Sequence, residues 1–328
     1  MRATVFGLGR VLLSAALALS ALAARAAAQT AAQPQSAAQP QRRVAVTFDD
    51  LPTPYGELED MRRITARLLA TLRRNRVPAV GFVNEGKLFR LGELDARAAL
   101  LKAWLDAGME LGNHTFSHID LRRAPLEQYR DDVVRGENVT RMLLADRGMK
   151  LRYFRHPFLF TGPTPEYKRG IEEFLAARGY TVAPVTVHNS DYVFADVYFK
   201  ARARGDEETA KRVADAYVPY TESVFEHFER LSAETFGREI PQVLLLHAND
   251  LNADRFDALA AMLARRGYTL VPLEEALKDP AYAEPDGPHA NGISWLHRWR
   301  AARGLPAKWE PEVPKFVGEL YRAGQRRN

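Results

Sequence analysis

The sequence contains no cysteine. This absence excludes disulfide bridges, thiolate metal ligands, cysteine nucleophiles and a lipid-modified cysteine after export. Any catalysis must therefore use histidine, carboxylate or hydroxyl groups. The residues that remain available for metal binding are histidine, aspartate and glutamate.

A strong excess of one charge is also missing. The 328 residues carry a formal net charge of +5, and Arg2, Arg10 and Arg25 lie in a segment that we expect to be removed, so that 5 − 3 = +2 remains. The sequence has no interleaved stripe of basic and aromatic residues either. We therefore expect no nucleic acid among the partners of this protein.

The apolar run near the start is too short to span a membrane. Residues 1–28 begin with Met1-Arg2, continue through an apolar stretch from Val11 to Ala24, and end on Ala26-Ala27-Ala28. This order is typical of a cleaved secretory signal peptide, and a span needs ~20 apolar residues. An uncleaved anchor is the alternative. We expect a periplasmic or secreted protein without stable membrane insertion, and the oligomeric state stays open.

After this segment, residues 29–42 are rich in Gln, Ala, Pro and Ser and predict a disordered linker. From Arg43 onward, short apolar runs alternate with longer amphipathic runs, which indicates an α/β fold with a parallel sheet. About seven such units favour a (β/α) barrel over an open sheet, without excluding the sheet. The expected strands are 44–48, 79–83, 109–112, 152–155, 181–187, 242–247 and 269–272. The expected helices are 58–75, 94–107, 126–147, 164–178, 206–231 and 253–266.

Polar residues lie at the carboxyl ends of these strands. Because barrels build their active sites at this end, we expect the polar residues to meet at one mouth. They are Asp49, Asp50, His114, Arg155, Asp191 and His247.

Asp49, Asp50, His114 and His118 have the composition of a catalytic metal site. One carboxylate and two imidazoles leave a metal an open position for water, and the second carboxylate stays free for another role. If the backbone bends at the strand end, Asp50 can ligate the metal while Asp49 faces the water. The alternative is a turn or helix-capping pair, which aspartates favour before Leu51-Pro52.

The spacing of His114 and His118 predicts two imidazoles on one side of a helical turn. The zinc-protease helix has this spacing with a glutamate base after the first histidine, but Thr115 stands there in this sequence. The base must come from elsewhere, and Asp49 is the candidate. A surface pair of histidines is the alternative.

The whole pattern resembles the polysaccharide deacetylases of the NodB-homology type, carbohydrate esterase family four, from about residue 44 to residue 273. Four motifs of that family occur in order. They are Thr47-Phe48-Asp49-Asp50, His114-Thr115-Phe116-Ser117-His118, Arg155-His156-Pro157-Phe158 and Leu245-Leu246-His247. The resemblance implies a distorted (β/α) barrel, a deacetylase domain over residues 43–275, and metal-dependent hydrolysis of acetyl groups on a sugar. Residues 276–328 are then expected to form a helical extension that packs on the barrel.

The resemblance also implies a role for each matching residue. The metal, usually zinc or another divalent metal such as cobalt, is held by Asp50, His114 and His118. Asp49 is the base that takes a proton from the attacking water, and His247 is the acid that protonates the leaving amine. Arg155 orients Asp49 and favours its ionised form. The backbone N–H of Phe158 helps to hold the developing oxyanion.

The family's fourth motif, of the type Asp-x-x-Asp-Trp, is altered to His188-Asn189-Ser190-Asp191-Tyr192. Asp191 keeps the carboxylate that tunes the acid histidine, so that the change concerns the substrate groove more than the chemistry. Phe158, Leu245 and Tyr192 are the candidate substrate-binding residues. No catalytic role is assigned to His156, His188, His227, His289 or His297.

We therefore expect an exported, metal-dependent hydrolase that removes N-acetyl groups from an N-acetylated glycan, such as peptidoglycan, a chitin-type oligomer or an exopolysaccharide. One alternative keeps the fold and acts on a non-sugar amide or an O-acetyl ester. Another is a catalytically silent sugar-binding relative. Loss of Asp49 or His247 would indicate a silent relative, and both residues are present.

Overall fold

The computed structural model describes residues 42–289 and 291–326. The predicted signal peptide lies outside the described residues, as does the predicted linker apart from Arg42, where the first strand begins. Among the described residues, no helix combines the length and the apolar character that crossing a membrane requires.

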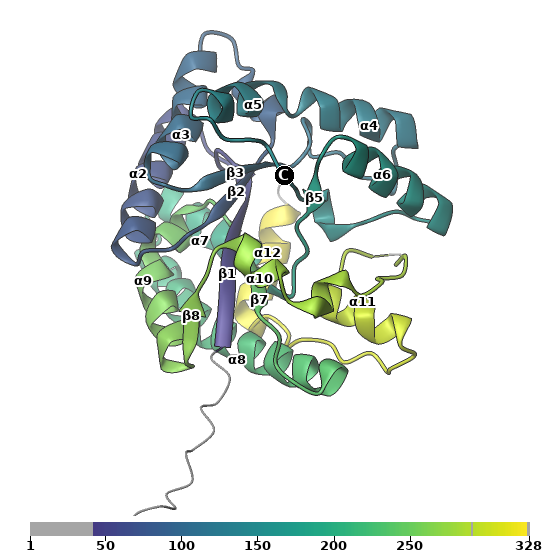
Figure 1. Cartoon of the computed structure of the whole chain (residues 1–328). Helices are drawn as coiled ribbons and strands as arrows, with labels where there is room; N and C mark the ends of the chain where they lie inside the picture. Colours follow the sequence, from purple (N-terminus) through teal and green to yellow (C-terminus); the bar gives the residue numbers. More distant parts are fainter. Residues whose placement is uncertain (1–41, 290, 327–328) are drawn as a thin grey trace, which may run out of the picture. The chain divides into compact units, whose positions relative to one another are not determined.

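The described residues form one parallel sheet of eight strands (Figure 1). The hydrogen-bonded order is β5-β4-β3-β2-β1-β7-β6, and β8 pairs with the start of β1. The prediction of a distorted (β/α) barrel with parallel strands is thus confirmed. The strands are β1 (Arg42–Leu51), β2 (Val80–Val83), β3 (Glu110–Asn113), β4 (Tyr153–Phe154), β5 (Thr181–Val182), β6 (Val187–His188), β7 (Gln242–His247) and β8 (Tyr268–Leu270).

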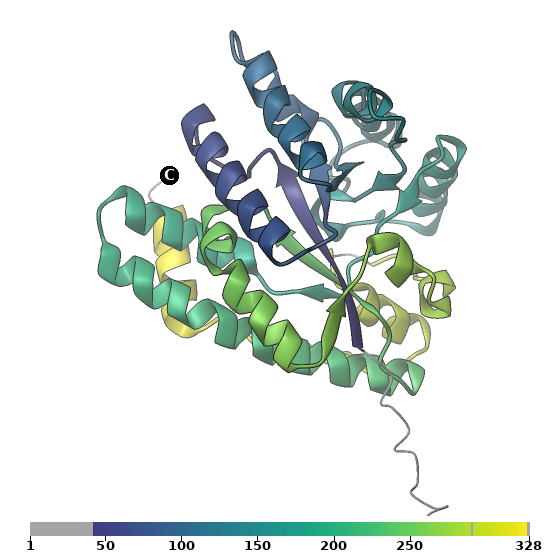
Figure 2. The ribbon, with the colours of Figure 1, turned by 60° about the vertical axis from the view of Figure 1, so that its left-hand side comes forward.

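Helices follow most strands and cover the sheet (Figures 1 and 2). The α-helices are α2 (Leu58–Arg74), α3 (Leu94–Asp106), α4 (Leu126–Arg135), α5 (Asn138–Ala145), α6 (Pro165–Ala177), α7 (Asp191–Ala203), α8 (Glu207–Phe236), α9 (Asp250–Arg265), α10 (Leu273–Leu277), α11 (Trp295–Ala302) and α12 (Lys315–Gln325). Short 3₁₀ helices cover Glu85–Leu88, Pro157–Leu159 and Pro280–Ala283. In the C-terminal part, α11 packs on α8 and α12 packs on α7.

The two faces of β1 show how the sequence places the site. Successive side chains of a strand point to opposite faces. Val44, Val46 and Phe48 belong to the large core cluster, which includes side chains of the surrounding helices, whereas Ala45 belongs to a second cluster with residues of neighbouring strands. By the same alternation, Asp49 lies on the face of Ala45, which is the inner face of the curled sheet.

The predicted fifth strand, 181–187, is wrong because the structure divides it into β5 and β6. β5 pairs with β4 and β6 pairs with β7, so the sheet has no ladder between β5 and β6 within the described residues. The intervening backbone bonds elsewhere: the Ala183 carbonyl accepts from the Arg155 guanidinium, and the Val185 carbonyl accepts from the Trp295 amide. Pro184 has no amide hydrogen to donate.

Two helix predictions also differ from the structure. The single helix expected over 126–147 is broken near Gly136, where a Cβ would lie 2.6 Å from the Phe116 backbone nitrogen. A glycine is needed there because the loop after β3 passes so closely. The helix expected over 206–231 continues as α8 to Phe236, and the sequence reasoning missed α7 altogether.

Candidate active site

One cavity of about 620 Å³ opens at the carboxyl ends of β1, β3, β6 and β7. Its lining includes every residue that the sequence proposed for the site except Arg155. These are Asp49, Asp50, His114, His118, Phe158, Asp191, Tyr192, Leu245 and His247. Arg155 is completely buried behind the cavity and reaches it through Asp49.

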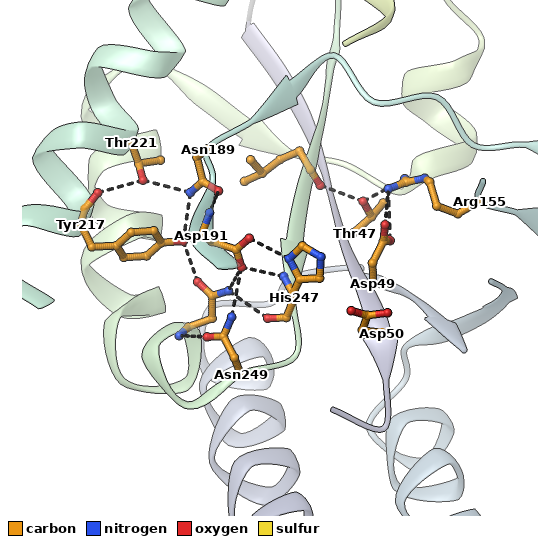
Figure 3. Close-up of polar contacts among 12 residues, drawn as sticks. Thr47, Asp49, Asp50, Arg155, Asn189, Asp191, Tyr217, Thr221, His247 and Asn249 are labelled. Atoms are coloured by element: carbon orange, nitrogen blue, oxygen red, sulfur yellow. Dashed lines mark hydrogen bonds and ion pairs between the residues drawn. The ribbon is translucent and has the colours of Figure 1, made fainter. Parts of the chain in front are cut away.

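Asp49 is held by Arg155 (Figure 3). Arg155 Nη1 lies 3.2 Å from Oδ1 and 3.3 Å from Oδ2 of the carboxylate. The guanidinium is fixed in turn, because Nη2 donates to the Thr47 hydroxyl at 3.1 Å and Nε donates to the Ala183 carbonyl at 2.8 Å. Burial raises the pKa of Asp49 to about 6, while the charge of Arg155 opposes that rise. Asp49 is therefore a buried carboxylate that can gain and lose a proton near neutral pH.

His247 is held by Asp191 on the other side of the cavity (Figure 3). His247 Nδ1 lies 2.8 Å from Asp191 Oδ1, and Asp191 Oδ2 accepts from the His247 backbone amide at 2.8 Å. The side-chain amides of Asn249 and Asn252 also donate to Oδ2, at 3.1 and 2.7 Å. Four donors thus fix one carboxylate, which leaves His247 Nε2 as the ring nitrogen free for chemistry.

The charge of Asp191 determines the titration of His247. Burial lowers the pKa of a histidine, but the charge and the hydrogen bond of Asp191 outweigh burial and raise the pKa of His247 to about 9. His247 is therefore a cation at neutral pH and can act as a proton donor.

Asp50, His114 and His118 form a group of ligand atoms that all lie within 4.8 Å of one another. Asp50 Oδ1 lies 3.6 Å from His118 Nε2 and 4.0 Å from His114 Nε2. Among the described residues, this buried oxygen has no hydrogen-bond partner, although the Lys87 ammonium is 3.4 Å away. A carboxylate oxygen and two imidazole nitrogens that converge without bonding each other fit a divalent metal such as zinc.

The tautomer of His114 supports this fit. His114 Nδ1 lies 2.8 Å from the Arg155 carbonyl, which can only accept, so Nδ1 carries the hydrogen. Nε2, the nitrogen that faces Asp50, therefore keeps a lone pair that a metal can accept. Burial lowers the pKa of His114 well below its ordinary value, so the ring is neutral. A neutral imidazole oriented through its other nitrogen is the usual form of a metal-binding histidine.

The backbone bends at Asp50, as the sequence argument required. Asp50 adopts a left-handed φ of 69°, and the pairing of β1 with β2 shifts register between Phe48 and Leu51. Two consecutive aspartates therefore both reach the cavity, where a regular strand would separate them.

The helical turn expected for His114 and His118 is wrong. His114 follows β3, and the next four residues form a loop with left-handed φ at Thr115 (65°) and His118 (55°). Asp132 holds this loop, because its carboxylate accepts from the amide and hydroxyl of Ser117 at 2.9 Å. The imidazoles still meet, with ring centroids 5.0 Å apart, because of this loop rather than helical periodicity.

The sequence reasoning missed several residues of the site. Lys87 donates to the Asp50 carbonyl at 3.0 Å, and Asn249 and Asn252 support Asp191. Tyr321 of α12 brings the C-terminal part to the cavity, 6.2 Å from the Tyr192 ring. Only Asn249 had a local signal, since an asparagine just before an amphipathic run is a typical helix cap, and it caps α9.

The polysaccharide deacetylase family matches residues 36–182, which include Asp49, Asp50, His114, His118 and Arg155. Solved structures with the same fold include a mutant of BA3943 of Bacillus anthracis, described as a CE4 family pseudoenzyme. It is 18% identical with a TM-score of 0.50, over 73% of this chain and 68% of that chain.

Two further structures are similar. The polysaccharide deacetylase Bc1974 from Bacillus cereus is 18% identical with a TM-score of 0.49, over 77% of this chain and 100% of its own. A family 4 carbohydrate esterase from Streptomyces lividans, in complex with acetate, is 21% identical with a TM-score of 0.46, over 76% of this chain and 98% of its own. Identities this low speak to the fold alone. With the family match over residues 36–182, the resemblance of this chain to the polysaccharide deacetylases of the NodB-homology type is confirmed.

Proposed function

We propose that this protein is an exported, metal-dependent hydrolase that removes N-acetyl groups from an N-acetylated glycan. The observation that carries the proposal is the pair of Asp49 and His247, which face one cavity and have separate buried partners of opposite charge. One group is poised to accept a proton and the other to donate one, which is what amide hydrolysis requires. Export rests on the sequence of residues 1–28 alone.

Asp50, His114 and His118 are the proposed metal ligands. When bound there, zinc or another divalent metal such as cobalt acts as a Lewis acid that polarises the acetyl carbonyl and activates water near neutral pH. The spare carboxylate of Asp49 lies close to this group, since its Oδ2 is 3.7 Å from His114 Nε2.

Asp49 is the proposed general base. It takes a proton from the water that attacks the acetyl carbon, and Arg155 holds the carboxylate in place for that step. The backbone N–H of Phe158 is proposed to donate to the carbonyl oxygen as negative charge develops on it.

His247 is the proposed general acid. The carbon–nitrogen bond breaks when the amine leaves, and the nitrogen needs a proton at that moment. His247 supplies this proton from Nε2, and Asp191 keeps the ring charged and oriented through Nδ1. The products are acetate and a free amine on the sugar.

The rim of the cavity offers aromatic surface to a glycan. Phe158 is 49% exposed and Tyr192 is 52% exposed, although both are large aromatic residues. Leu245 is a further lining residue of the cavity. These side chains are the proposed contacts of the sugar rings next to the acetyl group.

Acetate release tests the proposed function. The zinc-loaded chain is incubated with N-acetylglucosamine oligomers, peptidoglycan and acetylated xylan, and acetate is measured over time. Release from an N-acetylated glycan supports the proposal. Release from xylan alone assigns an esterase instead, and no release from any substrate by a folded, zinc-loaded chain points to a silent relative.

A further inference from the structure

A second group of metal-ligating side chains lies outside the active site. It consists of three histidines and a glutamate from four separate parts of the chain. His188 ends β6, His227 lies in α8, His297 lies in α11, and Glu310 follows α11. Ligand atoms of His227, His297 and Glu310 all lie within 4.8 Å of one another. We call these four residues the His/Glu cluster.

Glu310 is the centre of the His/Glu cluster. Its Oε2 lies 2.9 Å from His297 Nε2, and its Oε1 lies 3.2 Å from His188 Nε2. Donor atoms bound to one tetrahedral zinc ion at ~2.0–2.2 Å lie about 3.3 Å from one another. The spacing of these nitrogens and oxygens is therefore close to that of a ligand shell.

Ion pairing of Glu310 accounts for Nε2 of His188 and Nε2 of His297, whereas His297 Nδ1 is buried without a hydrogen-bond partner among the described residues. Among the described residues, His227 Nε2 is buried and has no hydrogen-bond partner, and the whole residue is only 9% exposed. A buried imidazole nitrogen without a partner is costly, and a metal ion would satisfy it.

The electrostatics of the cluster suit a cation. One carboxylate with neutral imidazoles is a typical donor set for zinc and similar transition metals.

We propose that His227, His297 and Glu310 bind one divalent transition-metal ion of the zinc type. The ion fastens the segment around Glu310 to α8 and α11, and the ion pair of Glu310 with His188 joins this segment to the end of β6. His188 also lines the active-site cavity, so the ion held by Glu310 stiffens one wall of that cavity through this pair.

Metal content tests this proposal on the full chain. Each variant is loaded with zinc, dialysed, and analysed by mass spectrometry for zinc per chain. We expect two equivalents in the wild type, one in Glu310→Gln and one in His118→Ala, which removes a ligand of the active-site group. The matched control, Glu312→Gln, changes an exposed carboxylate two residues away and should keep two. One equivalent in the wild type that only His118→Ala removes would overturn the second site.

A second variant guards against a folding defect in Glu310→Gln. His227→Asn removes the unpartnered nitrogen and leaves the contacts of Glu310 with His188 and His297 in place. In a His118→Ala background, zinc should raise the melting temperature by several degrees, and His227→Asn should abolish that rise. An equal rise with and without His227 would overturn the proposal. If instead the single equivalent of the wild type is lost in Glu310→Gln, the proposed active-site metal fails and the second site stands.

Discussion

Asp49 and His247 are paired residues on the neighbouring strands β1 and β7, and each faces the cavity with a buried partner behind it. Arg155 bonds Asp49 and Asp191 bonds His247, so each partner has the opposite charge. The environments separate the two titrations, because burial raises the pKa of Asp49 to about 6 and Asp191 raises that of His247 to about 9. Between these values, the carboxylate is ionised and the imidazole is charged, which are the forms that a base and an acid need.

The pH dependence of activity should therefore be bell-shaped. Activity falls below about pH 6 because Asp49 is protonated and cannot accept a proton, and it falls above about pH 9 because His247 is neutral. A bound cation near Asp49 lowers the pKa of that carboxyl, so that activity extends to lower pH. Measuring kcat/KM across this range checks the prediction. A profile without an alkaline limb would remove His247 as the acid.

Asp191→Asn should move the alkaline limb to lower pH. The substitution removes the negative charge that raises the pKa of His247, so that burial then lowers it. Asp196→Asn, on the same helix and paired with Lys200, is the control and should leave the limb unchanged. An alkaline limb that stays in place in Asp191→Asn would show that Asp191 does not support the acid.

Arg155→Met should destabilise the fold and move the acid limb of the pH–rate profile to higher pH. Removing one partner of a buried ion pair costs about 3–5 kcal/mol, because Asp49 is left buried without a counter-charge. The charge of Arg155 lowers the pKa of Asp49, so its loss raises that pKa further. Denaturant unfolding and a pH–rate profile measure the two effects. Arg152→Met is the control and should change the free energy of unfolding much less, since its pairs with Glu110 and Glu274 are partly exposed.

Removal of divalent metal should stop turnover. A chelator withdraws the ion proposed for Asp50, His114 and His118, and added zinc or cobalt should restore acetate release. His118→Ala should show little activity at any zinc concentration that restores the wild type. Turnover that persists after complete metal removal would exclude the metal-dependent mechanism.

The sequence predicted the inner face of the sheet better than the loops. The alternation Ala45, Thr47, Asp49 and the motif residues at strand ends were sufficient to place the site, because parallel strands all end at one edge. The loop of His114 and His118 was predicted as a helical turn because spacing alone does not show that Asp132 holds it. The backbone between β5 and β6 is bonded by Arg155 and by Trp295, and Trp295 lies more than 100 residues later in the chain.

The His/Glu cluster could not be predicted from sequence. Its residues are separated by 39, 70 and 13 positions, from 188 to 227, 297 and 310, so they form no motif with a characteristic spacing. The packing of α11 and of β6 against α8 brings the three histidines together. Tyr321 enters the cavity for a similar reason, because α12 packs on α7.

The most direct test of the account measures acetate release and zinc content together in Asp49→Asn. If Asp49 is the base and Asp50 the ligand, the variant keeps the zinc of the wild type and loses turnover by about 10²–10⁴-fold. Asp50→Asn should lose zinc and turnover together. Loss of zinc in Asp49→Asn would show that the two aspartates have the opposite roles, and full turnover in Asp49→Asn would contradict the acid–base pair.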